Sequence, residues 1–120
     1  MASPDKWLAY CVGFAGLWLI FNGLLHDILV IRNRKIFDKD LIRLLIDGHI
    51  LIFSGILYLV CYQGVRDHEA LAFTVAIVNC LFVLGYCGLI YKILPAVVVI
   101  VMTVVVLIWL VMEHPLLKTA

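Results

Sequence analysis

Four long apolar runs, separated by short polar segments, constrain this chain more than any other feature. Each run is close to the ~20 residues that an α-helix needs to cross the hydrocarbon of a bilayer. The clearest is the last, which extends for 17 residues from Ala96 to Met112 without a charge, a glycine or a proline. Its many valines favour a strand in water, but in lipid a single segment satisfies its backbone groups internally only as a helix. The runs therefore predict four transmembrane helices.

The composition supports this reading and excludes other classes of protein. With 66% hydrophobic residues, 14% charged residues and a mean hydropathy of +1.16, the chain is too apolar for a water-soluble globule. Nine scattered Lys and Arg residues and a net charge of +1 build no basic face, so no nucleic-acid partner is expected. The four cysteines have no CxxC spacing and should pack as small apolar side chains. We predict an all-α, polytopic integral membrane protein with four transmembrane helices in an antiparallel bundle of two hairpins.

Start and stop signals set approximate helix boundaries. Ser3 and Pro4 are suited to the cap and the first position of the first helix. Asp40 is the expected cap of the second helix, Asp67 of the third, and Pro95 opens the fourth. In a single domain of residues 1–120, the helices should span about 4–32, 41–62, 68–91 and 95–112.

Lys and Arg residues are distributed unequally between the two ends of the predicted bundle, and positive loops remain cytoplasmic. The end with both termini carries three of them: Lys6, Arg66 and Lys118. The other end carries six: Arg32, Arg34, Lys35, Lys39, Arg43 and Lys92. The sequence thus predicts both termini outside and the loop 32–40 in the cytoplasm, in a membrane that it does not identify.

Ionisable side chains interrupt the first two apolar runs at matching depths. Asp47 lies seven residues beyond Asp40, or about 10 Å along a helix, and His26 lies six residues before Arg32, or about 9 Å. Because the two helices should be antiparallel, these positions fall at the same level. We expect one buried polar cluster near the cytoplasmic side: His26, Asp27, Arg43, Asp47 and His49.

Several interpretations of this cluster stay open. A carboxylate in a membrane must turn inward, pair or become protonated. Arg43, four residues before Asp47, offers a local ion pair, whereas an Asp–His hydrogen bond could instead cross the hairpin. The groups could also line a proton, ion or solute path. His26 and His49 are weak candidate ligands for a metal or haem because no compact ligand spacing supports them, so no cofactor is predicted.

Further polar residues surround this cluster in the sequence. Asn22 and Ser54 extend it along the two helices, and Asn79 and Tyr86 form a second polar stripe on the third helix. His68 and His114, at predicted helix ends, should be solvated. Four basic residues of the charged loop either set the topology or attract anionic headgroups: Arg32, Arg34, Lys35 and Lys39.

No GxSxG, HExxH or paired acidic motif is present, so the sequence favours a protein that is not an enzyme. Acid–base chemistry by His49 and Asp27 remains an open alternative. Shallow polar residues and smooth apolar helices favour a helix-packing interaction module or accessory subunit of a membrane complex. The alternative is a homo-oligomeric small-solute, ion or proton-coupled transporter or channel, and a third possibility is a haem-, metal- or quinone-binding protein. The expected partners are the lipid bilayer and other transmembrane helices.

Overall fold

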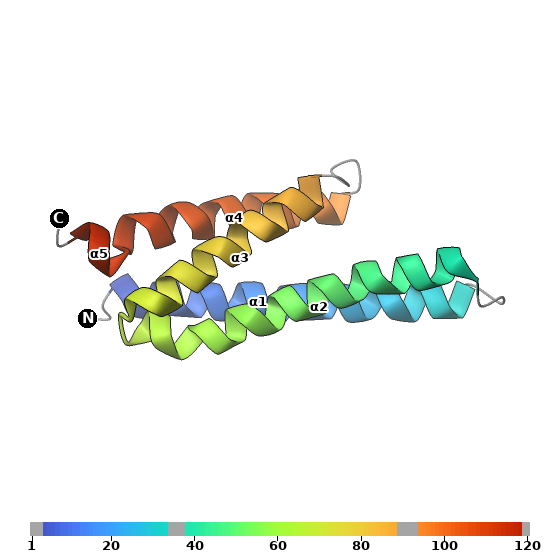
Figure 1. Cartoon of the computed structure of the whole chain (residues 1–120), viewed down its shortest axis with the longest axis horizontal. Helices are drawn as coiled ribbons and strands as arrows, with labels where there is room; N and C mark the ends of the chain where they lie inside the picture. Colours follow the sequence, from blue (N-terminus) through green and yellow to red (C-terminus); the bar gives the residue numbers. More distant parts are fainter. Residues whose placement is uncertain (1–3, 34–37, 89–93, 119–120) are drawn as a thin grey trace.

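The computed structural model describes residues 4–33, 38–88 and 94–118, and the regular structure in these ranges is helical. The elements are α1 (Pro4–Asn33), α2 (Lys39–Arg66), α3 (Ala70–Gly88), α4 (Leu94–Glu113) and the short α5 (Pro115–Lys118). Four of them, α1 to α4, are long and apolar enough to cross a membrane. Figure 1 shows these four helices lying roughly along the long axis of a molecule that measures 55 × 23 × 23 Å.

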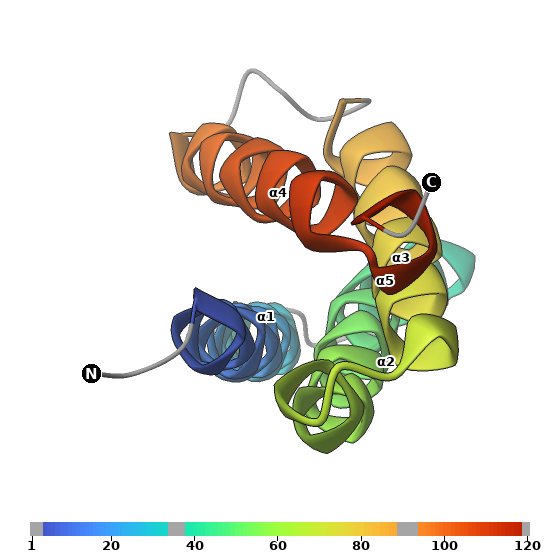
Figure 2. The same ribbon diagram turned by 90° about the vertical axis from the view of Figure 1, so that its left-hand side faces the viewer.

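The helices pack as two unequal pairs. The longer pair consists of α1 and α2, which lie side by side over most of their 30 and 28 residues and run in opposite directions (Figure 1). The shorter pair consists of α3 and α4, with 19 and 20 residues. Viewed along the long axis, α3 lies between α2 and α4, and α1 completes the ring (Figure 2). The end of the α1/α2 pair at which α1 ends and α2 begins extends beyond the shorter pair (Figure 1).

Two glycine pairs bring the backbones of α1 and α2 into direct contact. A β-carbon at Gly16 would lie 2.7 Å from the carbonyl oxygen of Gly55, and one at Gly23 would lie 2.6 Å from that of Gly48. The glycines are seven residues apart on both helices, a spacing that returns to nearly the same helical face. Small residues permit such close approach between helices in lipid. The two pairs therefore set the register of α1 against α2.

Side chains from α1 to α4 fill the centre of the bundle. The largest fully buried ones include Leu8 and Leu19 of α1, Tyr58 of α2, Phe73 of α3 and Leu110 of α4. They belong to one continuous apolar core. In the described part of the molecule, side chains from all four long helices thus form one packed core.

The helix caps differ from the predicted ones. Asp38, not Asp40, caps α2, because its Oδ1 accepts a hydrogen bond of 2.9 Å from the Leu41 amide. A capping side chain bonds an amide two or three residues further on, and the chain is already helical at Lys39. Asp40 lies in the first turn of α2, where the helix dipole still favours an acid. The predicted cap Ser3 lies outside the described residues.

The connection from α2 to α3 also corrects the prediction. Asp67 ends α2 instead of capping α3, which begins at Ala70, close to the expected start of this helix. The Glu69 amide donates to the Gly64 carbonyl (2.8 Å) and the His68 amide to the Val65 carbonyl (3.1 Å), the two bonds of a Schellman motif. His68 occupies its left-handed position, with φ of 64°, where glycine is usual. The predicted end of this helix at residue 91 lies outside the described residues.

The expectation that His114 is solvated is wrong. His114 is buried where α4 meets α5, and its Nδ1 accepts a hydrogen bond of 3.1 Å from the Leu116 amide. In a neutral ring Nε2 then carries the proton, and it donates to Thr74 Oγ1 of α3 at 3.0 Å. His68 is half-buried, with its ring edge-on to Phe73. These imidazoles are packing elements that the sequence pattern did not reveal.

Candidate functional site

Asp27 is the centre of the polar cluster on the α1/α2 pair. Its side chain is only 12% exposed and lies against the backbone of α2 at Gly48, where a β-carbon would overlap the carboxylate. The absence of a side chain at Gly48 therefore makes room for the acid. Two imidazoles flank the carboxylate: His49 Nδ1 lies 3.1 Å from Oδ2, and His26 Nδ1 lies 3.6 Å from Oδ1.

The surroundings of His49 define the orientation of its ring. Besides approaching Asp27, Nδ1 lies 2.7 Å from the Leu45 carbonyl oxygen. A carbonyl and a carboxylate only accept hydrogen bonds, so Nδ1 carries a proton. In the neutral ring Nε2 then has a free lone pair. Because the His49 side chain is 71% exposed, the structure presents this nitrogen on the outer surface of α2.

One oxygen of Asp27 lacks a full partner. Within the described ranges Oδ1 is buried and accepts no hydrogen bond, because the 3.6 Å separation from His26 exceeds hydrogen-bonding distance. Leaving a buried polar atom unpaired costs about 1–3 kcal/mol, and more for a charged group. Asp27 is therefore the least satisfied acid that the structure describes in this cluster.

Asp47 and Arg43 form a separate group on another face of α2. Residues two apart on a helix point about 200° away from each other. Because His49 points towards Asp27 of α1, Asp47 points away from α1. The Asp47 carboxylate instead interacts with Tyr86 of α3. Asp47 and Arg43 line a surface hollow of about 300 Å³ with Asp40. In the described part of the chain no ion pair joins Arg43 to Asp47.

The predicted five-residue cluster is thus divided in two, and only part of it is buried. The first group contains His26, Asp27 and His49, and the second contains Arg43, Asp47 and Tyr86. Arg43 and His49 are exposed. The sequence placed these residues at one level of the bundle, but it did not resolve their directions around the helices.

The other predicted polar residues lie away from Asp27. Asn22 Nδ2 donates to the Trp18 carbonyl (2.7 Å) within α1. Asn79 Nδ2 of α3 donates to the Ser54 carbonyl of α2 (2.9 Å) deep in the core, where Ser54 Oγ has no hydrogen-bond partner among the described residues. This contact joins α2 to α3. It belongs to the interior of the bundle and not to the Asp27 group.

The predicted basic loop is described only at its two ends. Arg32 near the end of α1 and Lys39 at the start of α2 are exposed. Arg34 and Lys35 lie outside the described residues.

Sequence reasoning missed an exposed stripe on α2, which we call the α2 seam. Its six members alternate at spacings of four and three residues, and all are exposed: Ile42, Ile46, His49, Phe53, Ile56 and Val60. This period of 3.5 residues is that of a helix that packs along another helix. The spacing was present in the sequence. Apolar residues on every face of α2 concealed it, and only burial showed which face is uncovered.

The two candidate metal ligands share one carboxylate. The Nδ1 atoms of His26 and His49 both point towards Asp27, so any metal or haem would have to use their Nε2 atoms. Within residues 4–33, 38–88 and 94–118, no three His, Cys, Asp or Glu side chains gather as a metal site.

Comparisons with known protein families, curated proteins and solved structures find no match for this chain.

Proposed function

We propose that this chain is an integral membrane protein whose four long helices cross the bilayer as two antiparallel hairpins, and that it serves as a helix-packing interaction module in a membrane complex. The lengths of α3 and α4 support insertion, because 19 and 20 residues rise about 28–30 Å and match the ~30 Å hydrocarbon layer. Asp47 interacts with Tyr86 near the end of α3, so we expect the neighbouring Asp27 and His49 to lie near the boundary of that layer.

The observation that carries this proposal is the exposed His49 in the middle of the α2 seam. At the boundary of the hydrocarbon layer an imidazole on the outer surface keeps only part of its hydrogen bonding to water, and polar residues in such positions pair with neighbours or mark function. Asp27 and Leu45 hold the ring with Nε2 outward. A hydrogen-bond donor on a neighbouring helix would satisfy this nitrogen.

The shape of the seam supports the same partner. Ile46 and Phe53 lie one turn to either side of His49, and both are exposed. Apolar knobs at alternating spacings of three and four residues pack into holes on a facing helix. We therefore assign to the seam a transmembrane helix that carries a hydrogen-bonding side chain at the level of His49.

Photocrosslinking within native membranes tests this assignment. A photoreactive amino acid at Phe53 should yield a protein adduct of discrete mass, whereas one at Val101, an exposed position of α4, should react with lipid. His49→Leu should reduce the Phe53 adduct about threefold, since a hydrogen bond between membrane helices contributes about 0.6 kcal/mol on average. An adduct with twice the mass of the chain would identify the partner as a second copy. Equal adducts at both positions, or none at Phe53, would refute the proposal.

The orientation is part of the proposal. The uneven distribution of Lys and Arg supports cytoplasmic placement of the end that carries Arg32 and Lys39. Thiol reagents that do not cross membranes should label Lys39→Cys only from the cytoplasmic side and Glu69→Cys only from the opposite side. The reverse pattern would invert the topology and leave the seam assignment unchanged.

A homo-oligomeric proton-coupled transporter is the second candidate, and the unpaired Oδ1 of Asp27 favours it. Asp27 and His49 together form an acid and an imidazole within hydrogen-bonding distance, as in proton relays. Such a role predicts that Asp27→Asn abolishes proton-coupled uptake in vesicles while the Phe53 adduct persists. If the chain is an interaction module, Asp27→Asn should instead reduce the Phe53 adduct, and the unsubstituted protein should show no proton-coupled uptake.

A further inference from the structure

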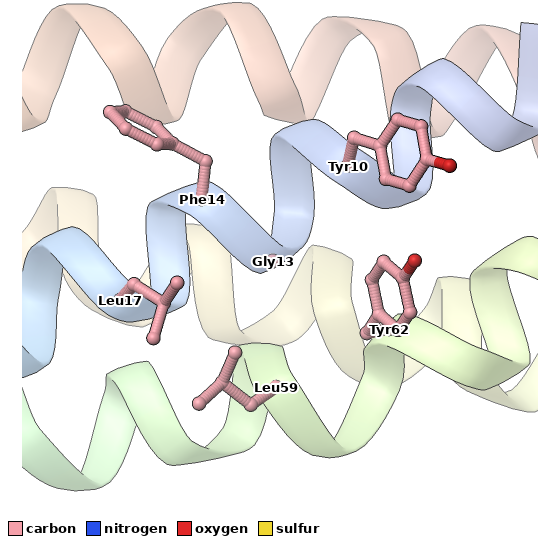
Figure 3. A pocket seen from close by; sticks show the side chains of 6 residues that line it. All are labelled: Tyr10, Gly13, Phe14, Leu17, Leu59 and Tyr62. Atoms are coloured by element: carbon pink, nitrogen blue, oxygen red, sulfur yellow. The ribbon is translucent and has the colours of Figure 1, made fainter.

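A crevice between α1 and α2 opens on the half of the pair opposite to Asp27. Its volume is about 390 Å³, and Figure 3 shows the side chains that line it. Six residues line it: Tyr10, Gly13, Phe14, Leu17, Leu59 and Tyr62. A β-carbon at Gly13 would lie 3.2 Å from the Tyr62 ring, so the crevice owes its depth to this glycine.

The two ends of the crevice differ in chemistry. Figure 3 shows the phenol rings of Tyr10 and Tyr62 at one end and the side chains of Leu17 and Leu59 at the other. The two phenol rings stack with their centres 6.3 Å apart. The crevice therefore has an aliphatic end towards the middle of the bundle and hydroxyl groups towards the chain termini.

Two cationic residues follow the tyrosines at the phenol end of the crevice, one on each helix. Lys6 precedes Tyr10 by four residues and Arg66 follows Tyr62 by four, so each cation lies one turn beyond a phenol on the same helical face. Because the two phenols stack on each other, the two cations reach the same level. In the described ranges neither Lys6 nor Arg66 forms an ion pair. The nearby acid Asp67 accepts a hydrogen bond from Gln63 Nε2 at 2.9 Å.

We propose that this crevice binds an anionic glycerophospholipid, with its phosphate between Lys6 and Arg66 and one acyl chain along Gly13. From Lys6 to Leu17 the helix rises about 16 Å, close to half of the ~30 Å hydrocarbon layer. A chain from a single leaflet fits this length, whereas a partner helix needs a face that continues across the midplane. The proposal rests on the membrane insertion argued above and concerns the end of the bundle opposite to the predicted basic loop.

Fluorescence quenching in nanodiscs provides the test. Trp7 lies edge-on to Tyr10 at 6.0 Å and Trp18 stacks on Phe14 at 6.2 Å, so both report on the crevice. In the full chain carrying Trp109→Phe, brominated phosphatidylglycerol in a phosphatidylcholine bilayer should quench at a several-fold lower mole fraction than brominated phosphatidylcholine.

Charge variants locate the effect. Lys6→Gln and Arg66→Gln should each weaken the preference for the anionic lipid about fivefold, the factor that corresponds to about 1 kcal/mol per cation. Arg32→Gln is the matched control: Arg32 lies in the last turn of α1, so any headgroup that it attracts is at the other end of the helix from Trp7, and the lipid preference reported by Trp7 should stay intact. Gly13→Leu should reduce quenching by both lipids because its side chain occupies the floor of the crevice.

Each contrary result has a distinct meaning. Equal quenching by the two lipids, or an equal loss in Arg32→Gln, would overturn the lipid site and leave membrane insertion standing. Competition by inorganic phosphate as strong as that by the phospholipid would also overturn it, because the acyl chain would then contribute nothing. Absence of quenching by either lipid would refute membrane insertion itself, and with it the proposed function.

Discussion

Gly55→Ala should loosen the α1/α2 pair, because the added methyl group has no space. It would lie 2.5 Å from the Gly16 carbonyl oxygen and 2.7 Å from Ile20 Cγ1. Ordinary van der Waals contact begins near 3.4 Å, so the two backbones must separate by about 0.9 Å. The Gly16 oxygen belongs to the backbone of α1 and cannot rotate away as a side chain does.

The cost follows from this separation. A radial gap of 0.5–1 Å forfeits about a quarter to a half of the dispersion attraction between facing atoms, and overpacking costs about 1–3 kcal/mol. Alanine returns up to about 1 kcal/mol through its better helix propensity. We expect Gly55→Ala to lower the free energy of unfolding by about 1–2 kcal/mol.

The chain supplies a matched control at Gly85 of α3, where an added β-carbon meets nothing within 4 Å. Gly85→Ala should be neutral or stabilising by up to about 1 kcal/mol. Both variants can be compared by titrating denaturing detergent into mixed micelles and following the tryptophan fluorescence. If Gly55→Ala is as stable as Gly85→Ala, the direct backbone contact between α1 and α2 is wrong.

Two further substitutions test contacts between other helices. Asn79→Ala removes the hydrogen bond to the Ser54 carbonyl and should destabilise the bundle in the same titration by about 0.6 kcal/mol, the average for such bonds between membrane helices, and by at most about 1.7 kcal/mol. An unchanged midpoint would show that the packing of α2 against α3 does not depend on this bond. His114→Ala removes the acceptor of the Leu116 amide and the donor to Thr74, so amide hydrogen exchange at Leu116 should accelerate. Unaltered exchange there would contradict the described packing of α5.

The number and positions of the long helices could be predicted from the sequence because apolar length has one main solution in lipid. Ala96 to Met112 has no residue at which a helix could stop, so its high β propensity had no effect. The caps were less predictable. Asp38 and Asp40 are both acids shortly before the same apolar run, and either could accept a bond from an early amide of the helix. Only the backbone conformation at residue 38 separates them.

The candidate site was predictable in depth but not in direction. Counting residues from the loop placed Asp27 and His49 at one level, since helical rise is constant. Direction around the axis depends on which face of α2 packs against α1, and the glycines determine that face. The sequence pattern assigned no role to Gly48. Its contact with Gly23 brings the backbones close, and its missing side chain admits the Asp27 carboxylate.

The same glycine contacts also couple the two proposed sites. Gly16 and Gly55 lie between the Tyr10–Tyr62 stack at one end of the pair and the Asp27–His49 contact at the other, so a separation of about 0.9 Å would widen both. Asp27 and His49, already 3.1 Å apart, would move beyond hydrogen-bonding distance. A loss of partner binding or of lipid preference in a glycine variant therefore cannot be assigned to either site. Substitutions outside the glycine contact, such as His49→Leu and Arg66→Gln, separate the two, and each should leave the other property unchanged.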